Sequence, residues 1–158
     1  MERIKRALPE LLDGLVAVVV GTRDADLRPA CARGLAVRVD PSTGRLVLYL
    51  SEARTAETLE NLRSNGAIAI ALDRPETHRS VQVKGRCVDI RPATEEERPV
   101  VERFLEGFFE QVIYLGMALS VRSIRAWPCL AVTVEVTEVF EQTPGPRAGE
   151  PYRPGGEG

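Results

Sequence analysis

Three short strand-like segments near the N terminus limit this chain to a small set of folds. They cover residues 15–22, 30–40 and 45–51, are rich in Val, Leu and Ala, and are separated by turn-forming residues at 24–26 and 41–44. A parallel pair of strands needs a crossover of about a dozen or more residues, which such short turns cannot supply. The sequence therefore predicts that the three segments form an antiparallel meander.

Helices and strands follow this meander without the regular alternation of a parallel α/β sheet. An amphipathic helix is predicted over 53–65, strands over 67–73 and 78–91, a helix over 94–115, and a last strand over 129–140. In the second of these strands Ser80, Gln82 and Lys84 share one face, and Val81 and Val83 share the other. Because strands predominate, we expect a mainly β (α+β) fold, a closed antiparallel barrel with peripheral helices.

Smaller features complete the expected organisation. Pro9 and Gly14 mark a short N-terminal helix with Pro9 in its first turn. Thr94 and Glu97 form a capping box at the start of the longest helix, whose expected apolar stripe is Val101, Phe104, Leu105, Phe108, Val112 and Leu115. A helical turn is expected over 120–125. The chain is thus read as one domain over 1–142 and a Pro- and Gly-rich tail over 143–158, expected to be extended or disordered.

Charge and motif content exclude several classes of function. The 21 Lys and Arg against 23 Asp and Glu give a net charge of -2, which provides no general attraction for nucleic acid or for an anionic membrane. A single histidine, His78, cannot build a multi-histidine metal site. The phosphate-binding loop, the dinucleotide-binding glycine motif and the nucleophile elbow are missing from the sequence. We therefore expect no nucleic-acid partner, no metal and no nucleophilic catalysis.

Cysteine usage and hydropathy bear on the cellular compartment. Cys31, Cys87 and Cys129 are widely spaced within apolar stretches, so we expect buried structural thiols rather than disulfides or metal ligands. The N terminus is charged and lacks the apolar region of a secretory signal. No apolar run reaches the ~18 residues needed to cross a membrane. The expectation is a cytoplasmic protein with no membrane association.

Two runs of residues resemble the pyridoxamine 5'-phosphate oxidase-like family of FMN-binding split barrels. Residues 58–69 read Thr-Leu-Glu-Asn-Leu-Arg-Ser-Asn-Gly-Ala-Ile-Ala, and residues 78–86 read His-Arg-Ser-Val-Gln-Val-Lys-Gly-Arg. In that family a helix ends near such an Asn before a buried strand, and the next long strand reaches a Val-x-Gly where the barrel bends. The resemblance implies an antiparallel split β-barrel with Greek-key topology. It also implies a homodimer with flavin at the subunit interface.

The resemblance further implies which residues bind FMN. Arg33 and Arg38 of the second strand segment, and the start of the helix after the third segment, would hold the phosphate, although Thr58 stands where the family has a Lys. Arg54 and Thr55 could substitute, because a helix N terminus beside an Arg is a good phosphate site on physical grounds alone. The implied cofactor-binding residues are Arg33, Arg38, Tyr49, Ser51, Arg54, Thr55, Thr58, Arg79, Ser80 and Gln82.

The leading interpretation is an FMN-dependent oxidoreductase in which the flavin exchanges hydride or electrons with an unknown small-molecule substrate. Residues 130–142 contain neither member of the family's Arg-x-His substrate motif, which argues against true pyridoxamine phosphate oxidase activity. Two alternatives stay open. One is a deazaflavin-dependent enzyme or a flavin reductase, and the other is a non-catalytic flavin or haem carrier or stress protein.

Overall fold

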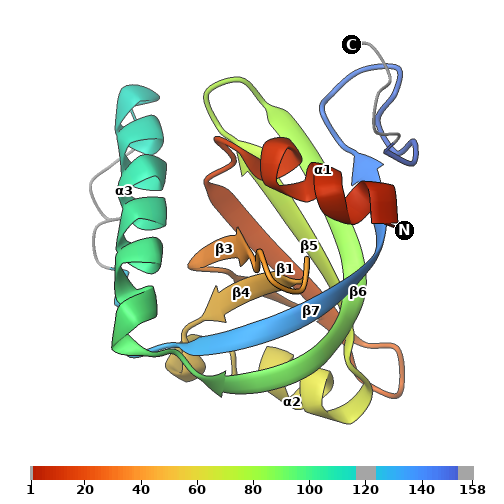
Figure 1. Cartoon of the computed structure of the whole chain (residues 1–158), viewed down its shortest axis with the longest axis vertical. Helices are drawn as coiled ribbons and strands as arrows, with labels where there is room; N and C mark the ends of the chain where they lie inside the picture. Colours follow the sequence, from red (N-terminus) through yellow and green to blue (C-terminus); the bar gives the residue numbers. More distant parts are fainter. Residues whose placement is uncertain (1, 117–123, 153–158) are drawn as a thin grey trace.

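Within residues 2–116 and 124–152, seven antiparallel strands curl into a barrel that three α-helices surround (Figure 1). The structure, a computed structural model, describes residues 2–116 and 124–152. The elements within these ranges are α1 (Glu2–Leu12), β1 (Ala17–Arg23), β2 (Pro29–Arg33), β3 (Ala36–Val39), β4 (Leu46–Leu50), the 3-10 turn η1 (Glu52–Arg54), α2 (Ala56–Asn65), β5 (Ala67–Arg74), β6 (Arg79–Pro92), the 3-10 turn η2 (Glu95–Glu97), α3 (Arg98–Tyr114) and β7 (Leu130–Glu141).

The strand order confirms the predicted fold class. It is β2-β1-β5-β6-β7-β4-β3, and every neighbouring pair is antiparallel. β5, β6 and β7 form a meander, and β4 lies beside β7 although α2, β5, β6 and α3 separate them in the chain. This is a Greek-key connection. The fold is therefore a mainly β, antiparallel barrel with peripheral helices.

The sheet closes on itself where the chain passes from β2 to β3. Gly34 donates its backbone N–H to the carbonyl of Val18 on β1 (3.0 Å), and Leu35 donates its own to the carbonyl of Tyr49 on β4 (2.9 Å). A Cβ on residue 34 would lie 2.5 Å from Val18 Cγ1, so the close approach requires glycine. The single strand predicted over 30–40 is therefore wrong, because this crossing divides it into the two edge strands of the sheet.

A second glycine bends the longest strand. The register between β6 and β7 shifts between Lys84 and Gly85. A Cβ on Gly85 would lie 2.4 Å from the carbonyl oxygen of Glu135, so a larger residue would force the two strands apart. Figure 1 shows β6 curving around the barrel from one end to the other. The Val-x-Gly bend expected from the sequence is present.

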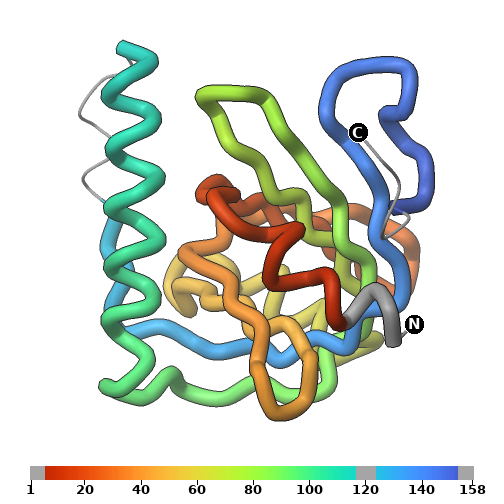
Figure 2. Tube along the Cα trace, turned by 45° about the horizontal axis from the view of Figure 1, so that its top comes forward, coloured from red at the N-terminus to blue at the C-terminus, as the bar shows by residue number. Residues whose placement is uncertain are grey.

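The main hydrophobic core fills the barrel. Val81 and Val83 face inward, as the alternation along β6 predicted. Leu8 and Leu11 of α1 and Leu59 and Leu62 of α2 pack into the same core, so these two helices cover the openings of the barrel. Figure 2 shows α1 and α2 on different sides of the strands.

The helix α3 packs on the outside of the barrel and has a core of its own. Val101 and Leu105 are buried against β3 and β4, and Phe108 and Val112 are buried near Ala17 of β1. Figures 1 and 2 both show α3 standing along one side of the sheet. The predicted apolar stripe is thus confirmed at these four positions. Its last member, Leu115, is 45% exposed, because it lies beyond the end of the helix.

The N-terminal helix is longer than predicted. It begins at Glu2, so Pro9 lies inside it rather than in its first turn. Pro9 is exposed, whereas Leu8 and Leu11 are buried in the barrel. Their burial offsets the backbone hydrogen bond that Pro9 cannot donate. The helical turn expected over 120–125 falls mostly on residues outside the described ranges.

The Pro- and Gly-rich tail folds back onto the sheet as far as it is described. The backbone N–H of Gln142 donates to the carbonyl of Ser80 (2.9 Å), and that of Tyr152 donates to the carbonyl of Val139 (2.8 Å). The Tyr152 side chain packs against the main core. An extended or disordered arm is therefore wrong for 143–152, because backbone pairing with β6 and β7 holds this segment in place.

Two further observations concern expectations from composition. Cys129 is buried and Cys87 is half-buried, but Cys31 on β2 is exposed, so the expectation of three buried thiols is wrong at that position. The alternation of β2 turns Cys31 outward beside Gly21, where no layer of structure in the described ranges covers it.

Across residues 2–116 and 124–152, every helix is too short or too polar to cross a bilayer.

Candidate functional site

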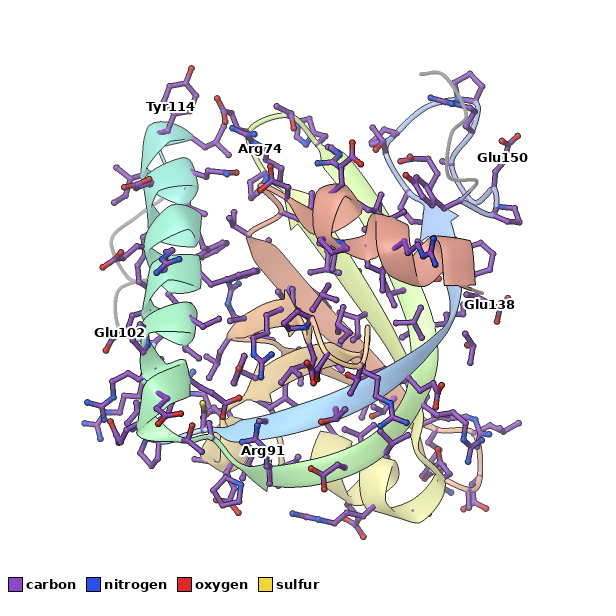
Figure 3. The ribbon with its side chains drawn as sticks, in the orientation of Figure 1. Arg74, Arg91, Glu102, Tyr114, Glu138 and Glu150 are labelled. Carbon is purple, nitrogen blue, oxygen red and sulfur yellow. The ribbon has the colours of Figure 1, made fainter. Side chains whose placement is uncertain are left out.

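A buried carboxylate organises one end of the barrel. Glu97 accepts hydrogen bonds from Arg91, from Arg38 (3.1 Å) and from the hydroxyl of Tyr49 (2.9 Å). The predicted capping box places it there, because its side chain also accepts the backbone N–H of Thr94 at the start of η2. Figure 3 labels Arg91 on the lower part of β6, where this strand runs beside β7. We call Arg38, Tyr49, Arg91 and Glu97 the carboxylate cluster.

The cluster fixes the protonation of its members. The hydrogen bonds from Arg91 hold the pKa of Glu97 far below its usual range, although burial opposes this shift. Burial raises the pKa of Tyr49. Burial alone would lower the pKa of Arg38, but its hydrogen bonds to Tyr49 and Glu97 raise it above the usual value. At neutral pH the cluster therefore holds two guanidinium cations, one carboxylate and one neutral phenol.

The start of α2 has no side-chain cap. Thr55 is the residue preceding the helix, but its hydroxyl donates to the carbonyl of Ser51 (2.7 Å) instead of accepting from the first turn. The structure shows no acceptor within its described ranges for the backbone N–H groups of residues 56–58. Arg54 is exposed immediately before them, and Thr58 is buried. Uncapped N–H groups beside a guanidinium form an anion-binding arrangement.

Arg33 and Gln82 lie in one row across the outer face of the sheet. Register places Arg33 opposite Val19, Val19 opposite Ala71, and Ala71 opposite Gln82. The Arg33 guanidinium stacks 3.9 Å from the centre of the Phe108 ring of α3. Burial lowers its pKa, and the charge of Asp73 partly offsets this. We call Arg33, Val19, Ala71 and Gln82 the outer row.

Arg79 and Ser80 lie at the start of β6, whereas Arg91 of the carboxylate cluster lies near its end. Both residues form hydrogen bonds with other parts of the chain. Arg79 donates to the carbonyl of Leu11 (2.6 Å), in the last turn of α1, and to that of Asp13 (2.9 Å), just after the helix. The carbonyl of Ser80 accepts the backbone N–H of Gln142 (2.9 Å), and its own N–H donates to the side-chain hydroxyl of Thr143 in the tail (3.0 Å). These two residues therefore anchor α1 and the tail.

The ten residues implied by the resemblance thus fall into separate groups. Arg38 and Tyr49 belong to the carboxylate cluster, Arg33 and Gln82 to the outer row, and Ser51, Arg54, Thr55 and Thr58 to the start of α2. Sequence reasoning missed Arg91 and the ion-pairing role of Glu97. The capping box did mark Glu97, but no local signal connects it with Arg38, which is 59 positions away.

A cleft opens between α1, β3 and α3, beside the carboxylate cluster. Its volume is about 390 Å³, and Arg38 lines it together with apolar residues of all three elements. Arg103 of α3 and Asp13, next to the end of α1, are the other charged residues in its lining. We call this the α1 cleft.

Comparisons with known proteins bear on the fold. No protein-family model matches the chain, and no curated protein is similar to it in sequence. Among solved structures, HupZ from Group A Streptococcus is 16% identical with a TM-score of 0.54, over 91% of this chain and 98% of that one. An FMN-binding protein from Syntrophomonas wolfei subsp. wolfei is 12% identical with a TM-score of 0.52, over 88% of each chain.

This chain is a split barrel. The likenesses confirm the fold that the sequence resemblance implied, and identities this low show the fold alone. A split barrel does not by itself fix a reaction, so function must be argued from the residues of this chain. The donor set at the start of α2 fits an anion such as a phosphate group, because it combines free N–H groups with the exposed Arg54, although Glu57 in the same turn adds one negative charge. Within the described ranges, no group of three potential metal ligands comes together.

Proposed function

We propose that this split barrel binds FMN, with the phosphate at the start of α2, and that the flavin serves an oxidoreductase reaction. The supporting observation is the uncapped first turn of α2 beside the exposed Arg54. A phosphate monoester carries about -1.5 to -2 charges at neutral pH, which favours the positive end of a helix and an Arg fork. A bound flavin would supply the hydride or electron transfer.

The outer row supports a position for the flat flavin ring and for a second copy of the chain. Val19 is 41% exposed, and Ala69 and Ala71 of the neighbouring strand add only small side chains to the same face. Such a face accommodates a planar ring or a packed partner without large rearrangement. Arg33 and Gln82 at the two ends of the row offer hydrogen-bond donors to the polar edge of the ring. A homodimer that buries this face follows from the proposal.

The test compares FMN with riboflavin, which lacks the phosphate. The purified protein is titrated with each ligand and binding is followed by quenching of flavin fluorescence. We expect Arg54→Ala to weaken FMN by about tenfold or more while leaving riboflavin unchanged, because only the phosphate meets Arg54. Arg63→Ala is the matched control, since Arg63 is also exposed but lies in the last turn of α2.

Two outcomes would contradict the proposal. Equal losses for FMN and riboflavin in Arg54→Ala would place the phosphate elsewhere. A purified protein that is colourless and binds neither ligand would remove the flavin altogether. Size measurement of the flavin-loaded protein tests the homodimer separately.

A further inference from the structure

The α1 cleft has the size and lining of a small-molecule site. A volume of about 390 Å³ lies in the range of ligand pockets, which are mostly apolar with a few convergent polar groups. Its walls come from three elements: Leu12 of α1, Val37 and Val39 of β3, and Val100 and Phe104 of α3. Phe104 and Val39 are only partly buried, so they offer apolar surface to a ligand.

Arg38 gives this apolar cleft a fixed hydrogen-bond donor. Its Nε donates to the Tyr49 hydroxyl (2.8 Å) and one Nη donates to Glu97 (3.1 Å). A guanidinium has five N–H groups, so the second Nη and one further N–H have no acceptor within the described ranges. Because the carboxylate cluster holds one edge of the guanidinium, the other edge is oriented before any ligand arrives. A donor fixed in this way loses little conformational freedom on binding.

The charged residues that line the cleft favour an anion with a single negative charge. Arg103 is exposed and lines the cleft together with Val100 and Phe104 of α3. Within the described ranges, the structure shows no acceptor for its guanidinium group. Arg38 and Arg91 share the single negative charge of Glu97, so the carboxylate cluster keeps one net positive charge, to which Arg103 adds a second at the cleft. Asp13 contributes one negative charge, which opposes a dianion such as a phosphate monoester. A carboxylate matches both the net charge and the two parallel donors of an Arg edge.

We propose that the α1 cleft binds a small, mainly apolar molecule that carries one carboxylate, with Arg38 and Arg103 receiving the carboxylate and Val37, Val100 and Phe104 contacting the apolar part. This site is lined by residues other than those at the start of α2. It therefore stands or falls independently of flavin binding.

The test uses 2-naphthoate and its neutral counterpart 2-naphthamide. Their shapes are closely matched, so the difference in affinity reports the charge. Binding to the wild-type protein is measured by ligand-detected NMR and by titration calorimetry at neutral pH, without and with saturating FMN. We expect 2-naphthoate to bind about tenfold or more tightly than 2-naphthamide, whether or not FMN is present.

Two variants locate the site. Arg103→Gln should remove most of the preference for 2-naphthoate, whereas Arg63→Gln, on α2, should retain it. Val100→Trp should weaken both ligands by filling the cleft, and circular dichroism confirms that each variant is folded. Equal binding of the two ligands, failure of both to bind, or an unchanged preference in Arg103→Gln would overturn the proposal. If the wild-type protein binds 2-naphthoate but does not bind FMN, only the flavin proposal is overturned.

Discussion

Arg91 and Glu97 form a two-point ion pair, with Nη1 2.7 Å from Oε2 and Nη2 2.9 Å from Oε1. The same carboxylate accepts from Arg38 of β3 and Tyr49 of β4. One buried side chain thus connects η2, at the start of α3, with three strands of the barrel. This connection adds to the apolar contacts by which α3 packs on the outside of the barrel.

Glu97→Gln should lower the free energy of unfolding by about 3 kcal/mol, because it removes the negative charge from two guanidinium groups and a buried phenol. Denaturation with urea, followed by circular dichroism, measures the change. Glu96→Gln is the control, since Glu96 is exposed in the same turn and should change stability by less than about 0.5 kcal/mol. Similar effects of the two substitutions would show that the cluster contributes little.

The contribution of Glu97 should depend on pH in one direction. Its pKa is lowered in the folded protein, so its stabilisation is complete above the unfolded-state pKa of about 4.3 and decreases as the pH falls below that value. The difference in unfolding free energy between wild type and Glu97→Gln should therefore be constant from about pH 7 to pH 5.5 and shrink towards pH 3. A difference that stays constant down to pH 3 would contradict the lowered pKa.

The three thiols should react with iodoacetamide in the order Cys31, Cys87, Cys129. Cys31 is exposed, whereas burial raises the pKa of Cys87 and raises the pKa of Cys129 to about 11, so the reactive thiolate is scarce at the buried sites. Peptide mass spectrometry after timed labelling at pH 8 gives the order. In guanidinium chloride all three should react at similar rates, which is the control for intrinsic reactivity. Labelling of Cys129 before Cys31 under native conditions would refute the assignment.

Gly34→Ala should destabilise the barrel by about 1–3 kcal/mol, because the added methyl group meets Val18 at the crossing from β2 to β3. Gly21→Ala is a matched control on the adjacent strand, where the nearest atom to an added Cβ, the carbonyl oxygen of Ala69, is 3.9 Å away. Thermal unfolding of both variants measures the difference. A Gly34→Ala protein as stable as Gly21→Ala would mean that the strands can separate at the crossing without cost.

The order of elements could be predicted because it depends on local signals. Alternation along 78–91 correctly placed Val81 and Val83 inside, and the Thr94 and Glu97 spacing correctly marked the start of a helix. The division at Gly34 could not be predicted, because it depends on β1 and β4 lying on either side of that residue. The folding back of residues 143–152 could not be predicted for a similar reason, because the partners of this segment lie on β6 and β7.

The candidate site was less predictable than the fold. Residues at the start of α2 are consecutive, so the sequence itself groups Arg54 with Thr55. Flavin binding by Arg38 and Tyr49, in contrast, stays a prediction, and the structure gives each of them a protein partner in Glu97 that the sequence does not indicate. Charge pairing across distant strands leaves no periodic trace in a sequence. The α1 cleft is likewise formed by three elements that only the tertiary structure brings together.

The pairing of β4 with β7 joins residues 46–50 to residues 130–134. Half of the chain, residues 51–129, lies between these two strands, so the ring of strands cannot be completed from contacts between neighbouring segments. Pairing of this kind forms slowly, because a large loop must close before any stabilising contact is gained. During synthesis on the ribosome, β4 can pair with β3 early, but its other edge stays unpaired until the last strand, β7, has emerged. The order of events in folding is in this way set by the position of one strand at the end of the domain.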